Sequence, residues 1–129
     1  MVEDLKSKLS AWRTKAQNDI QTVKNEFSSG KPVPDSICFH CQQAVEKYLK
    51  MYLVSNDKEP GKFHNIGILL QQCVDLDSSF RELAGIEYLT DYAVFLRYPD
   101  NFYNPTIEES KAAFELVKKV EVFVLKKIL

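Results

Sequence analysis

Apolar residues recur at three- and four-residue steps along most of the chain, a spacing that predicts amphipathic helices rather than strands. The clearest example is the stretch 38–54, CFHCQQAVEKYLKMYLV. A single helix cannot bury such a stripe alone, so the flanking segments are expected to supply partner helices. The apolar side of this helix carries Ile37, Cys41, Ala44, Val45, Tyr48, Leu49 and Tyr52.

Similar stripes predict a first helix over residues 2–27, a second helix from about Asp35, and a short third helix over 66–76. A fourth helix is expected to start at a Ser78 or Ser79 cap and to end at Pro99. Thr106 and Glu109 have the spacing of a capping box, which predicts the start of the last helix.

Turn-forming clusters rich in glycine, proline, serine and asparagine separate these segments, and no alternating run of strand length lies between them. The clusters are SSGKPVP at 28–34, SNDKEPG at 55–61 and DNFYNP at 100–105. The sequence therefore predicts an all-α fold, an up-and-down bundle of four main helices plus one short helix, forming a single domain over 1–129.

Composition narrows the class of protein further. Of the 129 residues, 45% are hydrophobic and 12% aromatic, as in a globular domain. Seventeen basic and eighteen acidic residues give a net charge of −1, so the overall electrostatic field does not predict binding to nucleic acid or membrane. The total charge does not exclude a local charged patch. Three cysteines without a signal-like N-terminus or a membrane-length apolar run favour a cytoplasmic protein with free thiols.

The spacing Cys38-x-x-Cys41 invites a metal or redox interpretation. A closed zinc site needs two further ligands, and only His40, His64 and Cys73 remain, without a second close pair. We therefore expect small buried thiols, no metal site and no cofactor.

The two histidines have open roles. His64 precedes the third helix and is expected either to fix the loop through a hydrogen bond to neighbouring backbone or to shuttle protons. His40 is either a surface residue or part of a shared cleft, and Lys47 lies on the same polar side of the second helix. No Ser-His-Asp set, glycine-rich phosphate loop or carboxylate-rich metal pattern is present.

The strongest candidate for ligand binding is Arg97, at a helix end cut by Pro99 and followed by the aromatic and polar loop DNFYNP. A guanidinium held there can grip a phosphate with two parallel hydrogen bonds, and the neighbouring rings can stack on a base. The alternative is that Arg97 pairs with Asp100 or another acid and only ties the bundle end. Tyr98, Asp100 and Tyr103 are the secondary candidates.

Taken together, these motifs resemble the HEPN domain family (higher eukaryotes and prokaryotes nucleotide-binding) over nearly the whole chain. The resemblance implies a helical bundle that forms a homodimer, is often encoded beside a minimal nucleotidyltransferase as a toxin-antitoxin-like pair, and binds nucleotides or cleaves RNA. The matching residues are Trp12, Ala16 and Asp19, the run from Gln42 to Lys50, His64-Asn65-Ile66, Arg97-Tyr98-Pro99-Asp100 and the DNFYNP loop.

The RNA-cleaving members of that family place a histidine after the arginine with four to six residues between the two. Here the residues at that spacing from Arg97 are Phe102, Tyr103 and Asn104, so the family's nuclease motif is not present. We therefore expect a binding module, with candidate ligand residues Arg97, Tyr98, Asp100, Tyr103, His40, Lys47 and His64 and no assigned catalytic residue. It is expected to dimerise through the second and fourth helices and to associate with a nucleotidyltransferase. A ribonuclease with a departed motif and a purely structural adaptor remain the alternatives.

Overall fold

The structure is a computed structural model that describes residues 2–95 and 103–128. Every regular element in that part of the chain is helical, which confirms the predicted all-α fold. The elements are α1 (Val2–Ser28), α2 (Pro34–Ser55), α3 (Ile66–Leu76), the 3₁₀ helices η1 (Ser78–Leu83) and η2 (Glu87–Leu89), α4 (Thr90–Phe95) and α5 (Ile107–Ile128).

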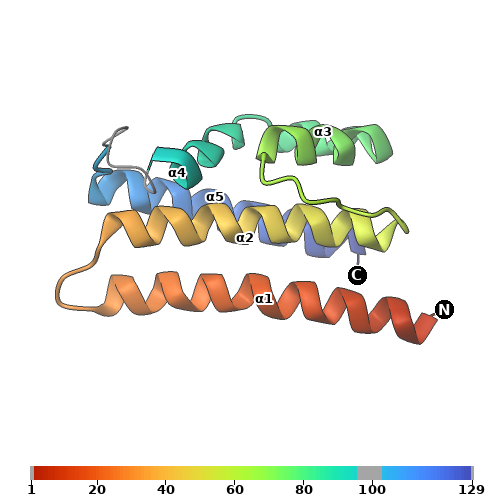
Figure 1. Ribbon diagram of the computed structural model, residues 1–129, viewed down its shortest axis with the longest axis horizontal. Coiled ribbons are helices and arrows are strands. Elements are labelled where there is room, and N and C mark those ends of the chain that lie inside the picture. Colours follow the sequence, from red (N-terminus) through yellow and green to blue (C-terminus); the bar gives the residue numbers. More distant parts are fainter. Residues whose placement is uncertain (1, 96–102, 129) are drawn as a thin grey trace.

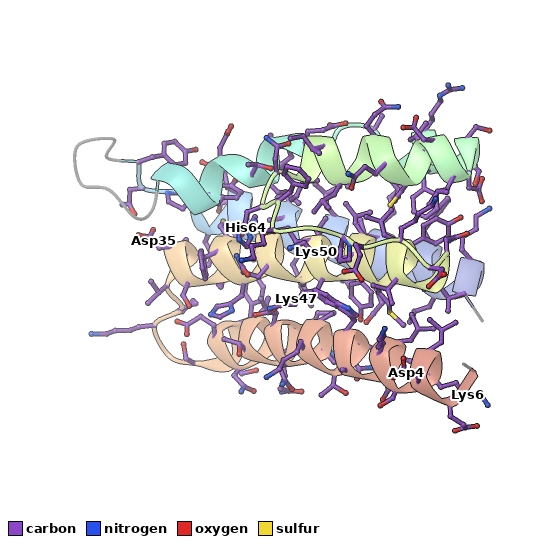
Figure 2. The ribbon with its side chains drawn as sticks, turned by 45° about the vertical axis from the view of Figure 1, so that its right-hand side comes forward. Asp4, Lys6, Asp35, Lys47, Lys50 and His64 are labelled. Atoms are coloured by element: carbon purple, nitrogen blue, oxygen red, sulfur yellow. The ribbon has the colours of Figure 1, made fainter. Side chains whose placement is uncertain are left out.

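Helix α2 is the centre of the bundle. Figure 1 shows α1 antiparallel to α2 on one side, the row from α3 to α4 on the opposite side, and α5 alongside α2 in the same direction. Side chains fill the space between these layers (Figure 2). No residue from Pro34 to Val54 is exposed, so α2 is covered along its length.

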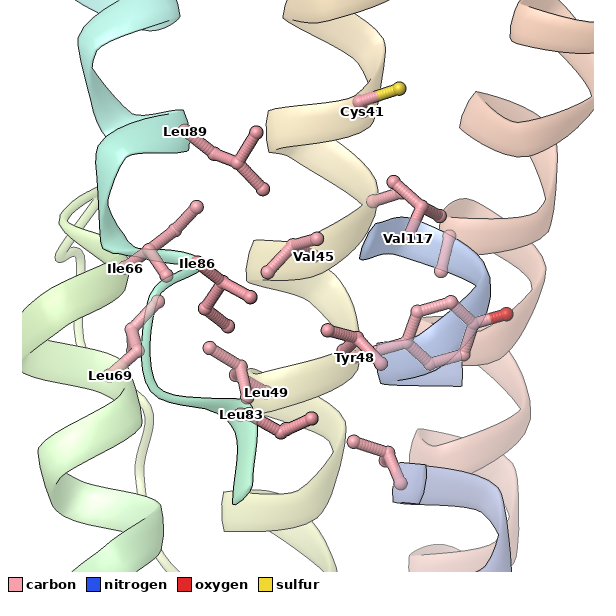
Figure 3. Packing of buried hydrophobic residues seen from close by; sticks show 14 of the residues in the cluster. Cys41, Val45, Tyr48, Leu49, Ile66, Leu69, Leu83, Ile86, Leu89 and Val117 are labelled. Carbon is pink, nitrogen blue, oxygen red and sulfur yellow. The ribbon is translucent and has the colours of Figure 1, made fainter. Parts of the chain in front are cut away.

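The core forms where α2 meets the other helices (Figure 3). Val45, Leu49 and Tyr48 of α2 are each fully buried. Burial of such side chains stabilises the fold by roughly 1.5–3 kcal/mol each, and hydrophobic burial is the main force that holds these helices together. The residues that meet α2 from α3, the 3₁₀ row and α5 include Ile66, Leu69, Leu83, Ile86, Leu89 and Val117.

The predicted continuous fourth helix is wrong. The chain instead forms η1, η2 and α4, because Gly85 adopts a φ of +107°, which a right-handed helix cannot contain. The Gly85 N–H donates to Glu87 Oε2 at 2.8 Å, and Asp77, rather than Ser78 or Ser79, caps η1 by accepting from the Ser79 N–H at 2.9 Å.

The apolar stripe of this broken segment is nevertheless buried. Short 3₁₀ turns keep a three-residue repeat, so the side chains still face α2. The buried members of the row are Phe80, Leu83, Ile86, Leu89 and Tyr92.

The starts of α3 and α5 are capped by side chains. Asn65 accepts from the Ile68 N–H at 3.0 Å and so caps α3. Glu109 N–H donates to Thr106 Oγ1 at 3.0 Å while Thr106 N–H reaches Glu109 Oε1 at 3.5 Å, which confirms the predicted capping box. Within the described part of the chain, no helix combines the length and the apolar character needed to cross a membrane.

Candidate functional site

A pocket of about 310 Å³ lies between the η2–α4 segment and the start of α5, and we call it the tyrosine pocket. Tyr88 and Tyr103 are each 42% exposed at its edge, whereas Tyr92 is buried beneath them. The rings of Tyr88 and Tyr92 meet edge to face with centroids 6.1 Å apart. The described lining consists of Tyr88, Asp91, Tyr92, Tyr103, Glu109 and Ala112.

Glu109 organises the floor of the tyrosine pocket. Its Oε2 accepts the Tyr103 hydroxyl at 2.5 Å and the Tyr92 hydroxyl at 3.3 Å, so one carboxylate orients two phenols from different segments. The hydrogen bond to Glu109 raises the pKa of Tyr103, and burial raises that of Tyr92. Both phenols are therefore neutral hydrogen-bond donors at physiological pH.

The described lining of the tyrosine pocket carries negative charge. Asp91 and Glu109 contribute carboxylates, and none of the described lining residues is basic. These residues can stack on a flat ring and accept N–H hydrogen bonds, but they repel a phosphate. A bound nucleotide would need a cation from elsewhere to hold its phosphate.

A second polar cluster lies between α1 and α2 and centres on Asp19, whose side chain is 10% exposed. His40 Nδ1 is 2.8 Å from Asp19 Oδ1, and Lys47 Nζ pairs with Asp19 Oδ2. Figure 2 shows Lys47 in the layer between these two helices. The Asp19 carboxylate thus holds the His40 ring by its Nδ1 atom.

A third polar cluster lies on another side of α2 and centres on Glu46, whose side chain is only 3% exposed. His64 Nδ1 approaches Glu46 Oε1 at 3.0 Å, Lys50 Nζ lies 3.7 Å from the same oxygen, and Gln42 Nε2 donates to Oε2. Figure 2 shows His64 on the side of α2 away from Lys47. The cluster ties the loop before α3 to the central helix.

The structure therefore separates the predicted ligand residues. His40 and Lys47 meet at Asp19, His64 pairs with Glu46 rather than with neighbouring backbone, and Tyr103 lies at the tyrosine pocket. Arg97, Tyr98 and Asp100 lie outside the described residues.

The three cysteines are fully buried and unpaired, as predicted for structural thiols. Burial raises the pKa of Cys38 to about 11 and that of Cys73 to about 12, and it raises that of Cys41 as well. Thiols with such values are protonated at neutral pH and are poor nucleophiles and metal ligands. Within residues 2–95 and 103–128, no group of three metal-ligating side chains lies close enough to hold an ion.

Sequence reasoning did not predict the acidic residues at the centre of the tyrosine pocket and of the two polar clusters. Glu109 was expected only as a capping residue, and Glu46 and Asp19 only as part of a family motif. One signal was available for Glu46, because Gln42, Glu46 and Lys50 recur at steps of four and form a polar stripe on a helix that is otherwise covered. Asp19 carried no comparable local signal.

Fold and site together define a small all-helical bundle with buried polar clusters along its central helix and an aromatic, acidic pocket at one end. A family model described as HEPN domain matches residues 9–128, and the chain belongs to the HEPN family. Membership supports a nucleotide-binding or ribonuclease-type module in general. Searches of curated proteins and of solved structures returned no match.

Proposed function

We propose that the chain is a dimeric HEPN-type binding module that holds a nucleotide or RNA phosphate with Arg97 and associates with a nucleotidyltransferase in a toxin-antitoxin-like system. The observation that supports it is the tyrosine pocket. Its described lining comes from Tyr88 to Tyr92 and from Tyr103 onward, the residues on either side of Arg97 in the chain.

The chemistry of the pocket and of Arg97 is complementary. Tyrosine faces stack on bases, while the carboxylates of Asp91 and Glu109 leave the phosphate to be neutralised by a cation. Arginine suits that role because its planar guanidinium donates two parallel hydrogen bonds to phosphate oxygens.

The test compares Arg97→Ala and Arg97→Lys with wild type by titration with mononucleotides and single-stranded RNA. We expect both variants to lose about tenfold or more in affinity, because lysine keeps the charge but not the two-pronged grip. Arg81→Ala, which removes an exposed arginine of η1, is the matched control and should bind as wild type.

Three other outcomes would count against the proposal. Wild-type affinity in both folded variants excludes Arg97 from the site. Retained affinity in Arg97→Lys alone reduces its role to that of a simple charge. Early melting of both variants assigns Arg97 to the scaffold and supports the structural adaptor.

The homodimer stays a prediction, with an interface that uses the second and fourth helices. Residues Pro34 to Val54 of α2 are buried or only partly exposed, so we expect the fourth-helix side to supply most of the contact area. The side formed by η2 and α4, with Tyr88 partly exposed, remains available, and tyrosine is enriched at interfaces. Light scattering at high micromolar concentration should return twice the mass of 14.9 kDa.

A ribonuclease is the second candidate, and the His40–Asp19 pair is the observation that favours it. Histidine held at Nδ1 by a carboxylate is the usual arrangement for a general base, and the His40 side chain is 29% exposed. Incubation of the purified protein with mixed RNA tests it, and cleavage that is lost in His40→Ala but kept in Arg81→Ala would establish this activity.

A further inference from the structure

We propose that the tyrosine pocket selects guanine among the nucleobases, with Asp91 as the residue that reads it. This inference rests on the proposed function in one respect, namely that the ligand is a nucleotide. It is otherwise argued from the side chains that line the pocket.

The lining suits a flat, neutral ring that carries N–H donors. Tyr88 and Tyr103, at the edge, are partly exposed aromatic side chains, and stacking on aromatic rings is favourable for every base. The two carboxylates accept N–H groups and repel carbonyl oxygens and bare ring nitrogens. Stacking therefore supplies affinity, and the carboxylates supply the choice of base.

Guanine is the base that matches a carboxylate on its pairing edge. Its ring N–H and adjacent amino group point the same way and fit the two oxygens of one carboxylate. Adenine and cytosine place their amino group beside a bare ring nitrogen, and uracil flanks its N–H with two carbonyls. Each of these three bases would bring a lone pair against a negative charge.

The two carboxylates of the pocket have different roles. Glu109 already accepts two phenols and a backbone N–H, so it positions Tyr92 and Tyr103. Asp91 is exposed in the first turn of α4, and within the described part of the chain its carboxylate takes part in no hydrogen bond or ion pair. Asp91 is therefore the carboxylate that is available to a base.

The experiment compares GMP with IMP, which differ only in the amino group of guanine, by calorimetric titration of the full-length protein. We expect wild type to bind GMP about tenfold more tightly than IMP, the size of one hydrogen bond to a charged group. In Asp91→Ala the two ligands should bind equally. Asp75→Ala, which removes an exposed aspartate of α3, should keep the wild-type ratio.

The outcomes separate this inference from the proposed function. If GMP, IMP, AMP and UMP all fail to bind, both are overturned. If the four nucleotides bind with equal affinity, or if Asp91→Ala keeps the preference for GMP, the guanine site is overturned and the nucleotide-binding function stands. A GMP preference that is lost only in Asp91→Ala supports both.

Discussion

At the scale of single residues, the main feature is the burial of charge along α2. Glu46 and Lys50 have side chains only 3% and 9% exposed and lie 3.7 Å apart. A buried charge is costly unless a partner of opposite sign and further hydrogen bonds compensate it. Gln42 and His64 supply those bonds to Glu46, so the cluster depends on all four side chains.

Glu46→Ala should lower the free energy of unfolding by about 3 kcal/mol or more, because it leaves the Lys50 ammonium buried without its partner. Glu115→Ala is the matched control, since Glu115 is 70% exposed and pairs with Lys118 at 2.6 Å. Its loss should be below about 1 kcal/mol. Urea unfolding followed by circular dichroism measures both, and equal losses would contradict the argument.

At the scale of elements, the segment between α3 and α5 shows how one backbone position divides a helix. The apolar repeat from Phe80 to Tyr92 is compatible with a continuous helix, but Gly85 at φ +107° separates η1 from η2. The break allows α4 to begin at Thr90, whose hydroxyl accepts the Ile66 N–H at 2.9 Å. The tyrosine pocket depends on this arrangement, because Tyr88, Asp91 and Tyr92 all follow the break.

Gly85→Ala should destabilise the protein by about 1 kcal/mol or more, because alanine at positive φ is strained. Gly30→Ala is a close control. An added Cβ meets nothing within 4 Å at Gly30 or at Gly85, and of these two glycines only Gly85 has a positive φ. The control should leave stability unchanged or raise it by up to about 1 kcal/mol. Thermal melts of the two variants provide the comparison, and a neutral Gly85→Ala would show that the turn tolerates a side chain.

At the scale of the whole molecule, contacts between residues that are far apart in the sequence hold the outer elements to one another around α2. Asp77, which caps η1, also pairs with Lys127 in the last turn of α5 at 3.0 Å. Hydrogen bonds from Ser79 and Lys127 lower the pKa of Asp77 from 3.8 to about 2. A carboxyl group whose pKa is lower in the folded state than in the unfolded state stabilises the fold when that carboxyl group is ionised.

The lowered pKa of Asp77 determines how the stability of the protein depends on pH. The contribution of Asp77 is complete above its unfolded pKa of 3.8 and is lost as the pH falls toward about 2. Asp77→Asn should therefore make the fall in stability across that range shallower than in wild type. Urea midpoints measured at several pH values test it, with Asp75→Asn as an exposed control on α3, and parallel profiles for Asp77→Asn and wild type would refute it.

The sequence by itself determined the helices that follow from local rules. The three- and four-residue repeats placed α1, α2, α3 and α5 close to their observed bounds, and the Thr106–Glu109 spacing placed the start of α5. These features depend on neighbours within one or two turns of the chain, so steric and hydrogen-bonding preferences of nearby residues are sufficient to specify them. The burial of the three thiols was predicted because they lie in helices that carry such apolar repeats, α2 and α3.

Only the tertiary structure decided which polar side chains meet. Asp19 and His40 are 21 residues apart, Glu46 and His64 are 18 apart, and Tyr92 and Glu109 are 17 apart. No repeat in the sequence encodes such pairs, because they depend on how the helices pack around α2. The break at Gly85 was likewise undetermined, since a glycine is compatible with both a helix and a turn until packing selects its φ.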